Sequence, residues 1–305
     1  MISVVMATYN GAKYLEQQLD SILGQTTSVQ EIIIVDDGSK DKTLEILNRY
    51  QKQYSHIQIY QNEKNLGPAR TFAKATLLSK GDLIFFCDQD DIWLENKVEK
   101  VRRVFHEKEN VQVLCTSYYL LMEKTSEIKN SSGHTGELTQ ISLERILIDN
   151  IAPGCTYAFR GEWREEAKKI QEDIFIHDWF YLVLGARENG LYFYDCPLIK
   201  YRIHAGNTIG LDLSFFDKFN RRKYIQRTSQ NVGFYQGIMK QKLITDPPTI
   251  QILNKLVEML SIRLAYVKGE MPFLKYVKQQ RQMESKGLSS IFIDVCRKMN
   301  VGNKS

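Results

Sequence analysis

Three aspartates, Asp88, Asp90 and Asp91, lie within four positions of the segment FFCDQDDIWL, directly behind an apolar run. Carboxylates this close repel one another, and each is costly to remove from water, so a positive partner is expected beside them. A helix cap explains one aspartate but not three. Carboxylate oxygens suit Mg²⁺ or Mn²⁺, and such a cation keeps several waters and bridges the phosphates of a substrate. The cluster therefore predicts a divalent-cation site.

A second acidic pair ends another apolar run, in the segment EIIIVDDGSKDKT. A turn followed by a helix cap at Ser39 or Asp41 accounts for part of this pattern. It leaves Asp36 and Asp37 unexplained, and a carboxylate at a strand end can accept hydrogen bonds from a nucleobase imide or a ribose. The pair is therefore a candidate nucleotide contact.

The first half of the chain alternates strand and helix patterns, which predicts a mainly parallel sheet with helices on both faces. Ligands of such sheets bind beyond the carboxyl ends of the strands, where both acidic clusters lie. Short apolar runs indicate the strands, and apolar residues at helical spacing indicate the helices. The expected strands cover 2–10, 31–39, 57–65, 82–91 and 111–122, and the expected helices cover 12–25, 40–51, 67–81 and 93–108.

The second half of the chain is less regular. Residues 123–140 are polar and rich in turn formers, which predicts a loop or a mobile lid. From residue 214 the pattern is helical without strands, so we expect an α/β domain at 1–213 and a helical region at 214–305. Between these parts we expect helices at 141–150 and 177–190, a turn with a short strand and a helix at 151–170, and one or two strands at 191–210.

Composition limits the class of protein. Of the 305 residues, 43% are hydrophobic and 25% are charged, which is ordinary for a globular protein. The formal net charge of +5 is too small to argue for nucleic-acid binding, and it suits an anionic ligand or membrane surface. Five scattered cysteines without a C-x-x-C pair predict a reducing compartment, no disulfide framework and no zinc site. Because the N-terminus has no basic leader and no apolar run approaches the ~20 residues of a membrane helix, we expect a cytoplasmic protein.

A family resemblance is carried by six segments in order, which are VVMATYNGAKYLEQQLDSILGQT, EIIIVDDGSKDKT, NLGPARTFAKA, FFCDQDDIWLENKV, GCTYAF, and HDW followed by PLIKYRIHAGNTIG. Together they resemble glycosyltransferase family 2, whose members have the GT-A fold and transfer a sugar from a nucleotide diphosphate with inversion. The combination of motifs is most similar to the bacterial rhamnosyltransferase-like branch, which builds surface polysaccharides. The resemblance covers about residues 1–210 and does not extend to the helical C-terminal region.

The resemblance implies a role for each matching residue. The divalent metal, Mn²⁺ or Mg²⁺, would be held by Asp90 and His204. The nucleotide pocket would be lined by the end of the first strand and by one carboxylate of each acidic cluster, namely Ala7, Thr8, Tyr9, Asp37 and Asp88.

In the segment HDW, Asp178 matches the catalytic base that deprotonates the acceptor hydroxyl, with a helix N-cap as the alternative. Many family members have a glutamate where this chain has His177, so the acidic neighbour of the base is missing. The candidates for the donor or acceptor sugar pocket are Asp91, Gly154, Cys155 and Trp179. Two of the sugar-pocket candidates have another interpretation: Asp91 would cap a helix, and Trp179 would pack in the core.

The resemblance implies an inverting, metal-dependent glycosyltransferase that moves rhamnose or a hexose, from dTDP-rhamnose or a UDP-hexose, to a glycan or lipid-diphosphate-linked acceptor. Two alternatives stay open: a nucleotidyltransferase that forms nucleotide sugars, and a nucleotide- or glycan-binding scaffold without turnover. An oxidoreductase is disfavoured because no G-x-G-x-x-G follows the first strand. The basic segments RRKYIQR and KYVKQQRQ indicate a solvated helix face, a contact with an anionic membrane surface, or packing within a homodimer.

Overall fold

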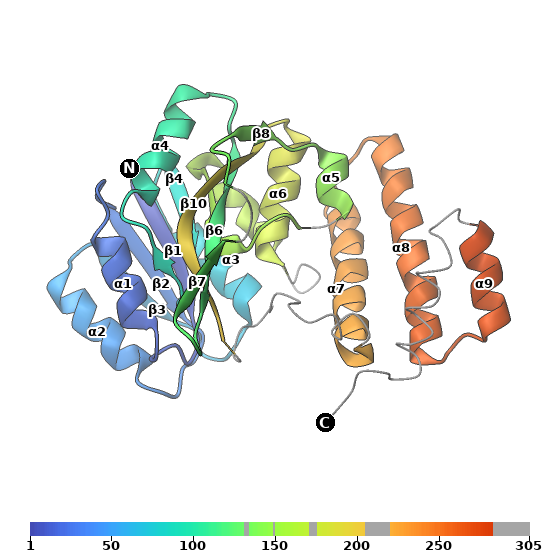
Figure 1. Cartoon of the computed structure of the whole chain (residues 1–305), viewed down its shortest axis with the longest axis horizontal. Helices are drawn as coiled ribbons and strands as arrows, with labels where there is room; N and C mark the ends of the chain where they lie inside the picture. The colour runs from blue at the N-terminus through green and yellow to red at the C-terminus, as the bar shows by residue number, and fades with distance from the viewer. Residues whose placement is uncertain (131–133, 149, 171–175, 205–219, 283–305) are drawn as a thin grey trace. The chain divides into compact units, whose positions relative to one another are not determined.

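The computed structural model describes residues 1–130, 134–148, 150–170, 176–204 and 220–282. The chain divides into two compact units, residues 1–207 and 208–305 (Figure 1). The boundary expected at residue 213 lies outside the described residues.

A mixed sheet forms the centre of the first unit, with the strand order β3-β2-β1-β4-β9-β6-β10-β5. Its first four strands are mutually parallel, and β10 is parallel to β6, so the prediction of a mainly parallel sheet is confirmed. The short strand β9 is antiparallel to both β4 and β6, and it joins the two parallel parts. The strands are β1 (Ile2–Thr8), β2 (Glu31–Asp36), β3 (Ile57–Gln61), β4 (Leu83–Cys87), β5 (Ile92–Trp93), β6 (Val113–Met122), β9 (Tyr157–Arg160) and β10 (Leu191–Ile203).

Alternate residues of the central strands enter two different cores, because successive side chains of a strand point to opposite faces of the sheet. Val4, Ile34 and Phe85 belong to a core that also contains the apolar stripes of α1, α2 and α4. On the other face, Phe86 contacts Phe72 of α3 and Tyr181 of α6. The helices thus cover both faces (Figure 1), and they are α1 (Leu15–Leu23), α2 (Thr43–Gln53), α3 (Pro68–Leu78), α4 (Lys97–Glu107) and α6 (His177–Arg187).

Two segments differ from the sequence expectation. The stretch predicted as a loop or lid contains β7 (Glu127–Asn130), which pairs with β6, and β8 (Leu138–Gln140), which pairs with β10. The helix expected from Trp93 begins at Lys97, since residues 92–93 pair with β10 instead. The helix expected within residues 151–170 is a 3₁₀ helix at 161–169, and the helix expected at 141–150 is α5 (Leu143–Ile148), so both agree with the expectation. The strands β5 and β8 pair with β10, which is distant in sequence, so local pattern does not reveal them, whereas β7 forms a hairpin with the adjacent β6.

The second unit consists, where it is described, of α7 (Arg221–Lys240), α8 (Pro247–Lys268) and α9 (Phe273–Gln282). Asp246 caps α8 by accepting a hydrogen bond from the Thr249 amide at 3.0 Å, and Gly269 ends it with φ at +89°. The rings of Tyr266 and Tyr276 stack with centroids 4.2 Å apart, which fixes α9 on α8. None of the described helices has the length and apolar character that crossing a membrane requires.

Candidate active site

The parallel register brings the two acidic clusters to one edge of the sheet. Thr8 at the end of β1 lies beside Asp36 at the end of β2, and Met6 lies beside Cys87 at the end of β4. The segments that follow these strands therefore emerge together, as the alternation of strands and helices predicts.

Asp90 and His204 lie in direct contact, with the carboxylate Oδ2 2.8 Å from the imidazole Nε2. The two side chains come from opposite halves of the unit, because Asp90 follows β4 and His204 follows β10. The ring of Tyr14 lies 4.8 Å from the His204 ring and limits its orientation. Adjacent ligands of one octahedral cation with bonds of ~2.1 Å lie ~3 Å apart, so this oxygen and nitrogen fit a single divalent ion.

Arg202 holds the turn that carries the aspartates. Its backbone amide donates to Asp91 Oδ1 at 2.9 Å, and its Nε donates to the carbonyl of Asp90 at 2.7 Å. The guanidinium also bonds Gln17 and lies 4.7 Å from the centre of the Tyr14 ring. Asp91 is buried and caps no helix, so its observed contacts are structural.

Lys97 is a buried cation beneath the acidic turn, and sequence reasoning missed it. Its Nζ donates to the carbonyl of Cys155 at 2.7 Å and lies 4.0 Å from the centre of the Trp93 ring. The charges of Asp88 and Asp91 act on it, while burial lowers its pKa to about 8. Lys97 therefore supplies part of the positive charge that is expected beside the aspartates. Lys97 lies four residues before the apolar Val101, so it is on the apolar side of the helix, and this spacing could have indicated that Lys97 is buried.

Burial and mutual repulsion raise the pKa values of two aspartates of the acidic turn, Asp88 and Asp91. Burial, followed by the charges of Asp91, Asp90 and Asp178, raises the pKa of Asp88 well above its usual value. Burial and the charge of Asp90 raise the pKa of Asp91 to about 7. A bound cation would relieve this repulsion, because an opposite charge favours ionised carboxylates.

A second group of metal-ligating atoms lies deeper, where oxygens of Asp88 and Asp91 and the sulfur of Cys155 are within 4.8 Å of one another. Burial raises the pKa of the Cys155 thiol, which hydrogen-bonds with Asp91. A protonated thiol is a poor ligand for Mg²⁺ or Mn²⁺, and Lys97 already supplies positive charge at this depth. The pair of Asp90 and His204 is the better match to a hard cation.

Asp178 lies at the start of α6 with its carboxylate held on both oxygens. Oδ1 accepts from the Trp179 amide at 2.8 Å, and Oδ2 accepts from Asn150 Nδ2 at 3.2 Å. Asn150 is itself fixed, because its Oδ1 accepts from the Tyr157 hydroxyl at 2.7 Å. Only 8% of Asp178 is exposed, and burial raises its pKa to about 6. Sequence reasoning singled out Asp178 as a candidate base but missed Asn150, which lies 28 positions before Asp178 in the chain.

Gly154 gives Asp178 the room that it occupies. A Cβ atom at position 154 would lie 2.9 Å from the Asp178 Cβ and 3.2 Å from its Oδ2. Contacts below 3.0 Å between such carbons require one group to move. The expected sugar-pocket residue Gly154 therefore shapes the site through the position of the carboxylate.

His177 and Trp179, the neighbours of Asp178, pack rather than line the site. Trp179 is 2% exposed, and its indole N–H donates to the Ile146 carbonyl at 2.8 Å, so it is not placed to stack on a sugar. The His177 ring stacks on Phe72 at 4.1 Å, and burial lowers its pKa to about 3. A neutral imidazole thus occupies the place of the acidic residue that many family members have.

The segment after β1 is joined to the aspartate turn by Gln89. The Tyr9 amide donates to Gln89 Oε1 at 2.9 Å, and Gln89 Nε2 donates to the Tyr9 carbonyl at 3.1 Å. The Tyr9 ring is exposed, whereas the hydroxyl of Thr8 is buried and donates to Asp36 at 3.0 Å. Ala7 lies just before these residues in β1, partly buried.

Asp37 holds the segment that leads into α3. Its Oδ1 accepts from Asn62 Nδ2 and from the Leu66 amide, each at 2.8 Å, and its Oδ2 accepts from the Gly67 amide at 2.9 Å. These three bonds use three of the about four acceptor positions that a carboxylate offers, and only 4% of Asp37 is exposed. The structure gives Asp37 a structural role in addition to the predicted nucleotide contact.

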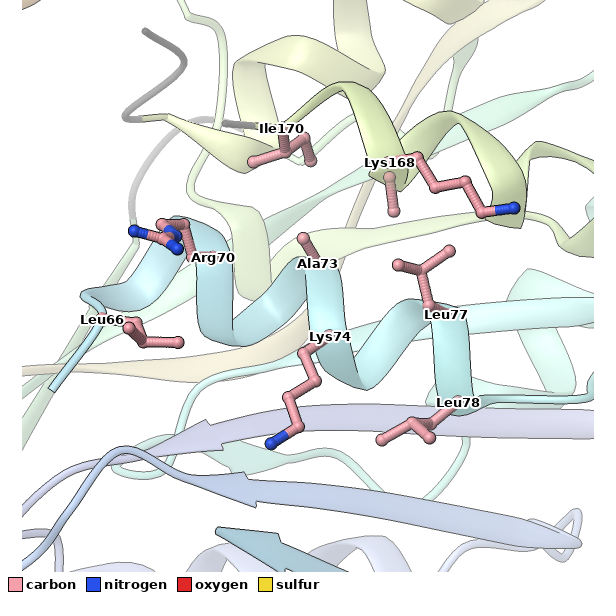
Figure 2. A pocket seen from close by; sticks show the side chains of 9 residues that line it. Leu66, Arg70, Ala73, Lys74, Leu77, Leu78, Lys168 and Ile170 are labelled. Carbon is pink, nitrogen blue, oxygen red and sulfur yellow. The ribbon is translucent and has the colours of Figure 1, made fainter. Parts of the chain in front are cut away.

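A cavity of about 360 Å³ lies between α3 and the 3₁₀ helix at residues 161–169 (Figure 2). Its apolar wall comes largely from one face of α3, including Leu77 and Leu78, and from Ile170. The ammonium of Lys74 donates to the Gln61 carbonyl and to Asn62. The described lining includes Arg70, Lys74 and Lys168 but no carboxylate, so it offers no carboxylate ligand for a hard divalent cation.

Comparison with known proteins agrees with this geometry. The model of the family "Glycosyl transferase family 2" matches residues 3–170. The chain is 33% identical to the dTDP-rhamnosyl transferase RfbG of Shigella flexneri over 231 residues, 71% of this chain and 77% of the relative. It is 36% identical to the glycosyltransferase GlyG of Streptococcus pneumoniae serotype 4 over 119 residues, 39% of each chain.

The fold is that of solved glycosyltransferase structures. The structure of S. aureus TarS 1-349 with UDP superposes with a TM-score of 0.58 at 18% identity, covering 87% of this chain and 72% of that chain. The complex of the same TarS fragment with UDP-GlcNAc has a TM-score of 0.57 at 18% identity and covers 97% of this chain and 89% of that chain. The expected fold class is confirmed, and the chain belongs to glycosyltransferase family 2.

Proposed function

We propose that this protein is an inverting, metal-dependent glycosyltransferase that uses Asp178 as its base. The observation that carries the proposal is the buried carboxylate of Asp178, fixed by the Trp179 amide and Asn150, whose charge acts on Asp88 of the acidic turn. A base and an acidic turn at one sheet edge are what a single displacement at an anomeric carbon needs.

The reaction follows from the state of Asp178. With a pKa of about 6 the carboxylate is ionised near pH 7, yet it is a stronger base than a free aspartate. It accepts the proton of the acceptor hydroxyl while that oxygen bonds to the anomeric carbon and the bond from this carbon to the diphosphate breaks. Attack and departure occur on opposite faces, so the configuration inverts. Asp178 then releases its proton to water.

The remaining residues prepare the donor site. Asp90 and His204 would hold a divalent cation, which supplies Lewis-acid stabilisation of the diphosphate leaving group. Arg202 and Gln89 keep the acidic turn in place through their bonds to the backbone of Asp90 and Tyr9. This pre-arrangement lowers the reorganisation that donor binding requires.

The donor is proposed to be dTDP-rhamnose or a UDP-hexose. RfbG is named as a dTDP-rhamnosyl transferase, and TarS structures contain UDP and UDP-GlcNAc. Thymine and uracil both present an imide N–H, and this group is proposed to donate to Asp37. The acceptor is proposed to be a glycan or a lipid-diphosphate-linked sugar in bacterial surface polysaccharide assembly.

A thermal-shift screen of the full chain against dTDP-rhamnose, UDP-glucose and UDP-GlcNAc, with and without Mn²⁺, tests the proposal. A ligand that binds only the folded state raises the melting temperature. We expect one nucleotide sugar to stabilise the chain in the presence of Mn²⁺, and Asp90→Asn to abolish that metal dependence. Asp20→Asn, on the exposed side of α1, is the matched control and should respond as the parent chain does.

Two other outcomes would replace the proposal. Release of pyrophosphate from a nucleoside triphosphate and a sugar phosphate would identify a nucleotidyltransferase. Donor binding without hydrolysis or transfer to any acceptor would identify a scaffold. The scaffold has less support, because Asn150 holds the Asp178 carboxylate and Asp90 contacts His204, as a catalytic site would require.

A further inference from the structure

The second unit is strongly basic. Residues 220–282 contain twelve lysines and arginines but only three aspartates and glutamates. This excess is larger than the net charge of +5 of the whole chain, so the rest of the chain is net acidic. A basic surface confined to one unit indicates that this unit meets an anionic partner.

The outward side of α9 combines this charge with exposed apolar side chains. Leu274 is 82% exposed and Phe273 is 47% exposed, both in the first turn of the helix. Lys275 and Lys278 are exposed, and Leu274, Lys275 and Lys278 share one side of the helix because residues three and four apart are neighbours. We call Leu274, Lys275 and Lys278 the α9 outer face; Phe273 lies on the other side of the helix, where its ring contacts Tyr266 of α8 at a centroid distance of 6.1 Å.

The packing of α9 turns this face away from the other described helices of the second unit. Tyr276 is fully buried and stacks on Tyr266, which turns the opposite side of the helix away from α8. Lys268, at the end of α8, is also exposed and adds charge just before the turn that leads to α9. An exposed leucine beside several lysines is costly in water but suited to a headgroup layer.

We propose that the α9 outer face docks the protein on an anionic lipid bilayer. Leu274 enters the boundary between headgroups and acyl chains, and Lys275 and Lys278 meet the lipid phosphates. Nucleic acid fits less well, because the most exposed side chain is an aliphatic leucine, which cannot stack on bases. The inference uses residues of the second unit alone and holds for any acceptor of the sugar.

Co-sedimentation of the full chain with vesicles tests the proposal. Vesicles of phosphatidylcholine containing phosphatidylglycerol should bind the protein, vesicles of phosphatidylcholine alone should not, and added salt should weaken the binding. Lys275→Gln with Lys278→Gln should lower the partition coefficient by about 25-fold, since each lysine near an anionic surface is worth about fivefold. Leu274→Ser should lower it by about tenfold, because burial of the leucine is lost.

Matched controls come from the first unit. Ile148→Ser removes another exposed apolar side chain, which is 68% exposed, and Lys52→Gln with Lys80→Gln removes two other exposed lysines. These variants should bind the vesicles as the parent chain does. The far-ultraviolet spectrum and melting temperature should not change in any variant, because all of the positions are on the surface.

Three results would overturn the proposal: equal binding to neutral and anionic vesicles, unchanged binding by the α9 variants, or tighter binding to single-stranded DNA than to anionic vesicles. A change in sedimentation velocity of the α9 variants without vesicles would instead assign this face to a contact between copies of the chain. Donor binding by thermal shift is measured on the same variants and should be unchanged. A failure of membrane docking is thereby separated from a failure of the proposed activity.

Discussion

Replacing the base is predicted to stabilise the protein while removing its activity. In Asp178→Asn the amide keeps the size of the side chain and can still accept the Trp179 N–H. It cannot take a proton from the acceptor, so turnover should fall by about 10³-fold, within the range that general-base catalysis contributes. The stability effect arises because burial raises the pKa of Asp178 from 3.8 to about 6.

The size and sign of that effect follow from proton linkage. Between about pH 4 and pH 6 the unfolded chain has lost the Asp178 proton while the folded chain retains it, so the free energy of unfolding falls as the pH rises. Above about pH 6 both states are ionised, and the accumulated penalty is about 3 kcal/mol for a shift of about two pKa units. The asparagine has no such penalty, but its N–H₂ faces that of Asn150, a mismatch that costs about 1 kcal/mol.

Urea unfolding of both proteins at about pH 7.5 and pH 4 measures the difference. We expect Asp178→Asn to be about 2 kcal/mol more stable at the higher pH and about 1 kcal/mol less stable at the lower one. Asp41→Asn is the control of opposite sign. Although burial opposes it, hydrogen bonds from Thr43 and Ala12 hold the pKa of Asp41 below its usual value, so the parent chain gains stability from this group as the pH rises. The stability of Asp41→Asn relative to the parent chain should therefore fall as the pH rises. An advantage of Asp178→Asn that does not vary with pH would refute the reasoning.

Three further substitutions test the supports of the site. Gly154→Ala should displace the Asp178 carboxylate and so lower kcat by roughly 10²-fold in a turnover assay. The donor Kd, measured by calorimetry, should not change. A kcat equal to that of the parent chain would contradict the contact distances. Lys97→Met should lower the free energy of unfolding, measured in urea near pH 7.5, by ~3 kcal/mol, because Asp91 and Asp88 lose their buried cation. Lys100→Met, on the same helix, is the control and should not show this loss. His204→Ala should weaken Mn²⁺ binding, measured by calorimetry with a nucleoside diphosphate present, by at least about tenfold. An unchanged Mn²⁺ affinity would exclude His204 as a metal ligand.

The elements that position the site could be predicted because they are encoded locally. The β-branched run that ends at Asp36 and the apolar run that ends at Cys87 form parallel strands, and their register brings the acidic residues to one edge. Hydrophobic alternation and strand ends are sufficient for that conclusion. The antiparallel strand β9 could not be predicted in the same way, because its pairing with β4 and β6 joins segments far apart in the chain.

The supports of the site depend on tertiary contacts and were largely missed. Lys97 reads as one charge among many on an amphipathic helix, yet it is fully buried against the Cys155 carbonyl. Asn150 and Arg202 act through bonds to residues 28 and 111 positions away. A polar residue is recognised as buried only when its partners are known, since local pattern treats it as solvent-exposed.

The central claim is that Asp178 is the base of a metal-assisted sugar transfer. Release of nucleoside diphosphate from the donor found in the thermal-shift screen, with Mn²⁺ and water as the acceptor, tests it most directly in the parent chain and Asp178→Asn. The account predicts steady release by the parent chain and a loss of about 10³-fold in the variant, with unchanged donor affinity. Release by Asp178→Asn at the rate of the parent chain would contradict it.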